Sequence, residues 1–141
     1  MTQSWQFWAL LSAGFAALTA IFAKVGIEGV NSNYATFLRT VVVVLALGAL
    51  LWATGQFREP ASLSGRTIVF LVLSGLATGA SWLCYFRALQ IGKAAQVAPV
   101  DKLSVVFVAV LAALFLGERL SPGGWAGVGL ISAGALLLAV S

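Results

Sequence analysis

The chain has 141 residues, of which 61% are hydrophobic and 9% carry a formal charge. Soluble domains average about 45–50% apolar and about 25% charged residues, so this composition excludes a water-soluble enzyme, a DNA-binding module and a disordered tail. The net charge of +4 comes from scattered lysines and arginines, which argues against a nucleic-acid partner.

Five long apolar segments follow one another along the chain. Uncharged runs occupy residues 1–23, 40–57, 67–86, 103–117 and 120–141. A helix needs about 20 apolar residues to cross a bilayer, and only the fourth run is shorter than the usual range of about 17–25. We therefore predict an all-α, polytopic membrane protein with a single membrane domain over residues 1–141. Its five transmembrane helices are expected at residues 5–23, 34–54, 66–89, 94–116 and 122–140.

Capping and turn residues flank these segments. Asn33, Ser64 and Ser121 are placed to cap the second, third and fifth helices. Gly55 and Gly117 follow helix ends, where glycine accommodates a left-handed residue. Because the connections are short, consecutive helices are expected to run antiparallel.

The basic residues of the loops favour neither orientation in the membrane. One face is expected to carry Arg58, Arg66 and Arg119. The opposite face is expected to carry Lys24, Arg87 and Lys93. Two interpretations stay open: other features set one orientation, or copies insert both ways up and form an antiparallel homodimer. Such a dimer would build an inverted repeat, an arrangement that many transporters contain within one chain.

The fourth segment carries two charges at membrane depth. Because its uncharged run is short, the helix must extend back through Asp101 and Lys102, and a start near Ala94 places Asp101 ~10 Å along the axis. Charges inside membrane helices are costly and usually mark a pathway. Adjacent helical residues do not face each other, so we expect each charge to need another partner, with Arg39 the candidate for Asp101.

A purely structural interpretation stays open for the same residues. Pro99 as the first helical residue would place Asp101 near a helix start, where the dipole favours an anion. Lys102 and Arg39 would then extend to the interface. In a third arrangement, Pro99 breaks the helix and leaves the preceding carbonyls free beside a cavity.

Three further side chains are candidates for a substrate pathway. Trp82 and Tyr85 on the third segment either pack in a core or line an aromatic pocket for a cationic or flat substrate. Ser104 either lines a polar path or bonds backward to its own helical turn.

Small residues at four-residue spacing occur in two segments. Gly75 and Gly79 lie on the third, and Gly123 and Gly127 open the fifth. Such pairs let helix backbones approach closely in lipid. The pattern predicts close helix packing without identifying the partner.

Several short pieces and their spacing resemble the EamA-type repeat of the drug/metabolite transporter superfamily. They are Tyr85-Phe86-Arg87-Ala88-Leu89, Ala98-Pro99-Val100, Leu116-Gly117-Glu118-Arg119-Leu120 and the glycine-rich stretch from Gly127 to Gly134. The resemblance covers essentially the whole chain and is strongest over residues 85–138.

Most members of that superfamily are similar to two such repeats fused into ten helices, whereas this chain has one. The resemblance therefore implies pairing with a second copy as an inverted repeat, with a substrate cavity surrounded by the first four helices of each. That cavity would be lined by parts of residues 8–20, 36–50, 72–86 and 98–110. The Asp101-Lys102 pair is not general to the superfamily, and the membrane glutamate of the related small multidrug transporters has no counterpart in the first helix here.

From these observations we expect a secondary-active transporter of a small polar or amphipathic metabolite. It would act in a bacterial-type cytoplasmic (inner) membrane as a homodimer by alternating access. Asp101 would be the protonatable or ion-pairing group, while Lys102 and Arg39 would bind an anionic or zwitterionic part of the substrate. The sequence has no nucleotide-binding loop, so transport must use gradients.

The alternative is a non-transporting membrane subunit that pairs with another small membrane protein, as a flippase or scaffold component. An enzyme is not expected, because the sequence has no histidine and one cysteine, Cys84. For the same reason we expect no catalytic residue, no metal and no other cofactor.

Overall fold

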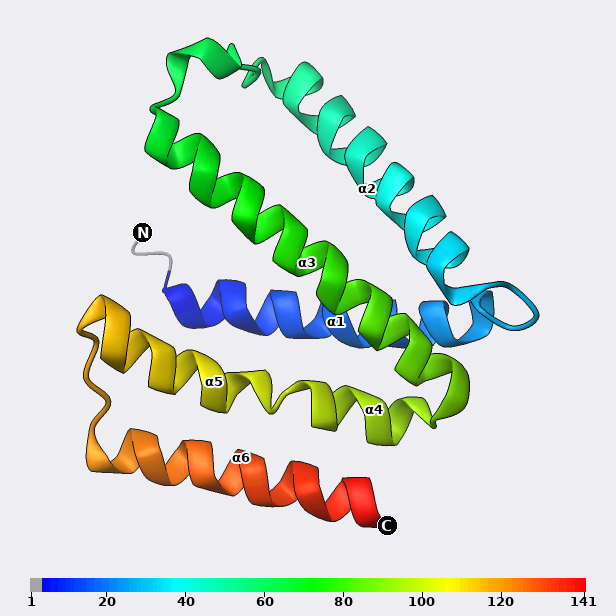
Figure 1. Cartoon of the computed structure of the whole chain (residues 1–141), viewed down its shortest axis with the longest axis vertical. Helices are drawn as coiled ribbons and strands as arrows, with labels where there is room; N and C mark the ends of the chain where they lie inside the picture. Colours follow the sequence, from blue (N-terminus) through cyan, green and yellow to red (C-terminus); the bar gives the residue numbers. More distant parts are fainter. Residues whose placement is uncertain (1–3) are drawn as a thin grey trace. The chain divides into compact units, whose positions relative to one another are not determined.

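A computed structural model describes residues 4–141 (Figure 1). Within that range the chain forms helices and no strands, and five segments are long and apolar enough to cross a membrane. They are α1 (Trp5–Gly26), α2 (Ser32–Thr54), α3 (Gly65–Ile91), a broken fourth segment (Ala94–Leu116) and α6 (Pro122–Val140). The prediction of an all-α protein with five membrane-spanning segments is confirmed.

Side-chain caps begin two of these helices at the predicted residues. The Ser64 hydroxyl accepts a hydrogen bond from the backbone N–H of Thr67 at 3.2 Å, and the Ser121 hydroxyl accepts one from that of Gly124 at 3.1 Å. Both bonds satisfy amides that have no partner within their own helix. The two caps therefore set the starts of α3 and α6.

The cap of α2 differs from the sequence prediction. Asn31, not Asn33, accepts hydrogen bonds from the backbone N–H groups of Asn33 and Tyr34, at 2.9 and 3.3 Å. The helix consequently begins at Ser32, two residues earlier than expected. Asn31 has extended backbone angles, φ −61° and ψ 127°, which aim its side chain at these amides.

Left-handed glycines end two segments as predicted. Gly55 has φ 64° after α2, and its backbone N–H bonds back to the last turn of that helix. Gly117 has φ 67° after the fourth segment. Residues with a Cβ are strained at such angles, which explains glycine at both helix ends.

The fourth segment consists of three pieces. They are α4 (Ala94–Asp101), α5 (Ser104–Leu111) and the π-helical turn η2 (Ala112–Leu116). Lys102 and Leu103 lie between α4 and α5 outside either helix. This segment, which is long and apolar enough to cross a membrane, is therefore an interrupted helix.

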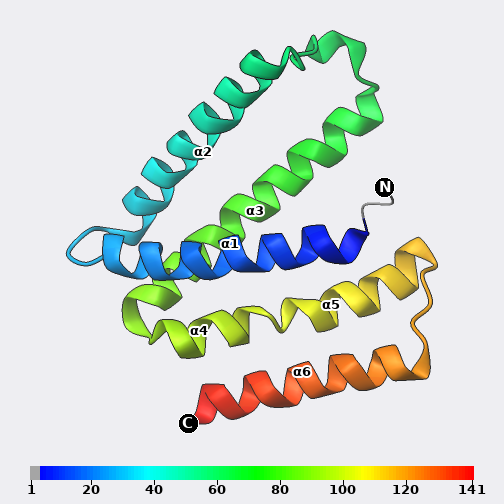
Figure 2. The ribbon, with the colours of Figure 1, turned by 180° about the vertical axis from the view of Figure 1, so that it is seen from behind.

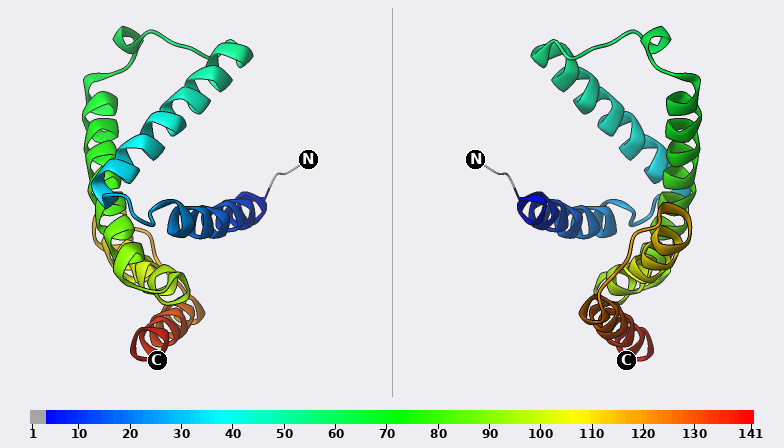
Figure 3. Two further views of the ribbon diagram at one scale, coloured as in Figure 1. Left: turned by 90° about the vertical axis from the view of Figure 1, so that its right-hand side faces the viewer. Right: turned by 90° about the vertical axis from the view of Figure 1, so that its left-hand side faces the viewer.

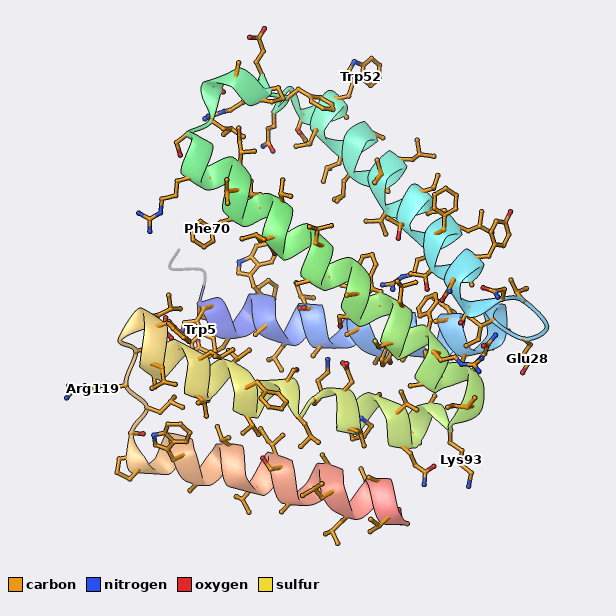
Figure 4. All side chains as sticks on the ribbon, viewed as in Figure 1. Trp5, Glu28, Trp52, Phe70, Lys93 and Arg119 are labelled. Carbon is orange, nitrogen blue, oxygen red and sulfur yellow. The ribbon has the colours of Figure 1, made fainter. Side chains whose placement is uncertain are left out.

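The described chain divides into two compact units. One contains Ala23–Gln90, with the end of α1, α2, the short 3-10 turn η1 (Pro60–Ser62) and most of α3. In this unit α2 and α3 converge at the start of α2 and diverge toward its end (Figure 3). Glu28 lies in the loop before α2, and Trp52 lies in the last turn of that helix (Figure 4). The convergent end holds the most buried side chains of the unit, Phe86 and Leu89, which are 2% and 0% exposed.

The other unit contains α1 up to Phe22 and the chain from Ile91 to Ser141. The interrupted segment of α4 and α5 lies alongside α6 and runs antiparallel to it (Figure 2). Ala135 of α6 is buried, and Gly124, Val128 and Ser132 are half-buried. The spacing of these four residues defines one face of the helix.

Candidate functional site

The break in the fourth segment follows Pro99. Proline has no backbone N–H and its ring crowds the carbonyl four residues earlier, which weakens the helical ladder. Beyond it the hydrogen bonds tighten to three-residue spacing: Leu103 bonds to Val100, and Val105 bonds to Lys102, each at 3.0 Å. The proposal that Pro99 is the first helical residue is wrong, because α4 begins at Ala94 and continues through Pro99 to Asp101.

Asp101 and Lys102 lie at this break and pair with each other. The Lys102 Nζ is 3.6 Å from the Asp101 Oδ2, with the two side chains 57% and 38% exposed. The expectation that adjacent charges would not pair is therefore wrong. It assumed a regular helix, whereas Lys102 has left the helix and its side chain can turn toward Asp101. Ser104 begins α5 directly after the break.

Arg39 stacks on aromatic rings of α3 in the other unit. Its guanidinium carbon lies 4.3 Å from the ring centroid of Trp82 and 5.3 Å from that of Phe86. Tyr85, half-buried beside Phe86, interacts electrostatically with the same guanidinium. The structure thus brings together three of the predicted site residues, Arg39, Trp82 and Tyr85.

Sequence reasoning proposed Asp101 as the partner of Arg39 and missed Phe86. The rings of Trp82 and Phe86 are the contacts of Arg39 within the unit from Ala23 to Gln90. Residues four apart on a helix lie on the same face, so the spacing of Trp82 and Phe86 was the available signal. Cation–π attraction stabilises a guanidinium over such rings by about 0.5–2 kcal/mol, depending on its desolvation.

Hydrogen bonds between distant residues hold the convergent end of the same unit. The ammonium of Lys24 donates to the backbone carbonyl of Leu89 at 2.5 Å, and the Gln90 amide donates to the carbonyl of Val30 at 2.5 Å. Arg87 donates to the Gln90 side-chain oxygen at 3.1 Å. From the sequence, Lys24 and Arg87 were interpreted only as loop and helix-end charges.

The predicted glycine pairs make no close contact among the described residues. Nothing lies within 4 Å of the position that a Cβ would take at Gly75, Gly79 or Gly127, and Gly123 meets only the Ser121 hydroxyl at 3.8 Å. On α6, Gly127 is half-buried together with Gly124, Val128 and Ser132, whereas Gly123 is exposed. A packing role for the two glycine pairs stays a prediction.

The sequence of this chain is similar to those of known transporters. The sequence pattern of the EamA-like transporter family matches residues 3–140. An "uncharacterized transporter in cobO 3'region" from a Sinorhizobium species is 64% identical over 140 residues, covering 99% of each chain. No solved structure matches. With the five apolar helices, these matches support a transporter role in a lipid bilayer and favour it over an enzyme.

Proposed function

Because this chain belongs to the EamA-like transporter family, we propose that it is a secondary-active transporter of a small polar or amphipathic metabolite. It resides in the cytoplasmic membrane of a bacterium and works as a homodimer by alternating access. Each copy contributes one five-helix membrane domain. The observation that carries the proposal is the Asp101–Lys102 ion pair at the interruption of the fourth segment.

The interruption of the helix provides a way for the Asp101–Lys102 pair to respond to a proton gradient. A continuous helix would keep adjacent side chains about 100° apart, whereas the turn at Lys102 allows the two charges to meet. Protonation of Asp101 would release Lys102, which could then bind a negatively charged group of the substrate. Non-helical backbone at membrane depth is tolerated where it lies within protein or lines a water-filled cavity.

The homodimer is supported by sequence features. The chain supplies five helices, half the number of a two-repeat transporter of the superfamily it resembles, and its loop charges are balanced between the two faces. An antiparallel pair would create an inverted repeat, whose interface is where transporters commonly place substrate and coupling-ion sites. Gly75, Gly79, Gly123 and Gly127 are available for such pairing, since a second copy meets no Cβ there.

Reconstitution into proteoliposomes tests the proposal. A pH-sensitive dye enclosed in the vesicles reports proton movement when single solutes from a panel of monocarboxylates, amino acids and amines are added outside. We expect at least one solute to move protons with the unmodified chain, and Asp101→Asn to abolish this movement while leaving exchange of that solute intact. Glu118→Gln, which removes a carboxylate from the loop before α6, is the matched control and is expected to keep full activity.

Two outcomes would contradict the proposal. Equal loss of folding, binding and exchange in Asp101→Asn would make the ion pair structural. Absence of solute-dependent proton movement, together with stable copurification of a different small membrane protein, would favour a non-transporting subunit of a larger complex.

A further inference from the structure

Arg39 is the charged residue of α2, and it lies well inside the span. It lies seven positions after the helix start at Ser32, which corresponds to ~10 Å along the axis. The helix continues from Arg39 to Thr54 without another charge. An arginine so placed is costly in a membrane and, by default, marks a functional site.

The aromatic rings attract the positive charge of the Arg39 guanidinium, but they do not satisfy its hydrogen-bond donors. Trp82, at 4.3 Å, and Phe86, at 5.3 Å, offer ring faces that attract the positive charge but accept no conventional hydrogen bond. Within the unit from Ala23 to Gln90, the guanidinium of Arg39 contacts these two rings and interacts electrostatically with Tyr85, and it forms no hydrogen bond and no salt bridge with a carboxylate of that unit. Its five N–H donors therefore stay available in the plane of the group.

The N–H donors of a guanidinium point outward in its own plane. The ring of Trp82, with its centroid 4.3 Å from the guanidinium carbon, limits where that group can lie. Two parallel N–H groups in one plane match the two oxygens of a carboxylate. Phe86 is 2% exposed and Trp82 is half-buried, so the position of the ring faces is set by packing.

The charge balance favours one monoanion. The carboxylates of the unit from Ala23 to Gln90 are Glu28 and Glu59, both outside the spans, so within this unit no carboxylate balances the charge of Arg39. A single carboxylate would neutralise it, whereas a phosphate dianion would leave an excess negative charge among apolar side chains. Uncompensated charge in such surroundings is strongly unfavourable.

From this geometry we infer that Arg39, stacked on Trp82 and Phe86, binds the carboxylate of an organic monoanion, with an uncharged apolar or aromatic body. The inference names the substrate class and, in treating the bound anion as a substrate, rests on the proposed function. Arg39 makes the two hydrogen bonds, Trp82 holds the guanidinium plane, and the body of the ligand lies against apolar side chains of α2 and α3.

Equilibrium binding of benzoate to the purified full-length chain in detergent tests the site. Benzoate carries one carboxylate on a flat ring, and benzamide has the same shape without the charge. We expect benzoate, and not benzamide, to raise the apparent melting temperature in a saturable manner. Phenyl phosphate is expected to bind more weakly, and equal or tighter binding would overturn the assignment to a carboxylate.

Three variants locate the effect. Arg39→Gln should abolish the response to benzoate, and Arg39→Lys, which keeps the charge but loses the planar pair of donors, should weaken the affinity about tenfold. Arg66→Gln is the matched control, because Arg66 also lies over a ring, at 5.8 Å from Phe70, but at the start of α3. An unchanged benzoate affinity in Arg39→Lys and Arg39→Gln would overturn the inference.

A spectroscopic measurement tests whether benzoate binds at Arg39 even when Arg39→Gln does not fold. In arginine-selective ¹⁵N spectra, we expect the ring current of Trp82 to displace the Nε–H signal of Arg39, and the loss of this signal in Arg39→Lys identifies it. Benzoate should move this signal more than that of Arg66, and benzamide should not. A benzoate-induced shift at Arg66 alone would refute the site.

The binding test is separate from the transport test. Arg39-dependent binding of benzoate without solute-dependent proton movement in proteoliposomes would overturn the proposed function and leave the carboxylate site in place. Proton-coupled movement of amines alone, without benzoate binding, would overturn the site and leave the transporter.

Discussion

The ammonium of Lys24 donates a hydrogen bond to the backbone carbonyl of Leu89 at 2.5 Å, across a sequence separation of 65 residues. Leu89 lies in the last turn of α3, where carbonyls have no partner within the helix. Lys24 lies in the last turn of α1. A charge that sequence reasoning assigns to a loop therefore connects two helix ends.

Replacing this lysine should destabilise the protein. Lys24→Met keeps much of the apolar stem but leaves the Leu89 carbonyl without its donor. We expect the free energy of unfolding to fall by about 1–2 kcal/mol, at the lower end for a charged hydrogen bond because the site is only part-buried. Denaturant titration in detergent measures the change. Lys93→Met, which removes a charge from the residue before α4, is the control, and equal losses in both variants would contradict the role of Lys24.

The Gln90 amide should contribute to stability through Val30 rather than through Arg87. Gln90→Glu keeps an oxygen for Arg87 but replaces the donor to the Val30 carbonyl with an acceptor. We expect it to destabilise the protein by about 1–2 kcal/mol despite the added opposite charge. Arg87→Gln should change stability by no more than about 0.5 kcal/mol, because its contact is exposed. A larger effect of Arg87→Gln in the same titration would contradict this ranking.

Removing Pro99 should strengthen the interrupted helix. Pro99→Ala restores an N–H that can donate to the Ala95 carbonyl, and alanine is favoured over proline by about 3 kcal/mol inside a helix. We expect a higher melting temperature and slower amide hydrogen exchange between Lys102 and Val106. If the interruption serves alternating access, transport should slow at the same time.

Pro122→Ala provides the matched control for this substitution. Pro122 is the first residue of α6, a position where proline is preorganised for the helix and lacks no useful donor. Its replacement is expected to leave both stability and exchange nearly unchanged. Faster exchange between Lys102 and Val106 in Pro99→Ala would show that the proline is not the cause of the interruption.

The balanced loop charges predict insertion in both orientations. Reporters that are active only in the cytoplasm or only in the periplasm, each fused after Ser141, should both give signal. Two lysines added near the N-terminus should shift the signal toward one reporter, because basic residues favour the cytoplasmic side. Signal from one reporter in the starting chain would establish a fixed orientation and exclude the antiparallel homodimer.

The number, type and approximate ends of the helices follow from the amino-acid sequence alone. In lipid, backbone N–H and C=O groups find no water to hydrogen-bond with, and an α-helix satisfies them within one segment. A continuous run of about 20 apolar residues is therefore expected to form a membrane-spanning helix. The caps at Ser64 and Ser121 and the left-handed glycines Gly55 and Gly117 followed from equally local chemistry. The sequence prediction chose Asn33 as the cap, whereas Asn31 is the cap in the structure. The two asparagines are two residues apart and have the same side chain, so local chemistry does not distinguish them.

Which polar side chains meet depends on how the helices pack against one another in three dimensions. Arg39 stacks on Trp82 and Phe86, Lys24 bonds to Leu89, and Gln90 bonds to Val30, because α2 and the end of α1 converge on the end of α3. The spacing of Trp82 and Phe86 shows that they share a helix face, but it does not show which element packs against that face. Asp101 and Lys102 pair for a different reason: the helix is interrupted at Lys102, and the rule for side-chain directions in a regular helix no longer applies there.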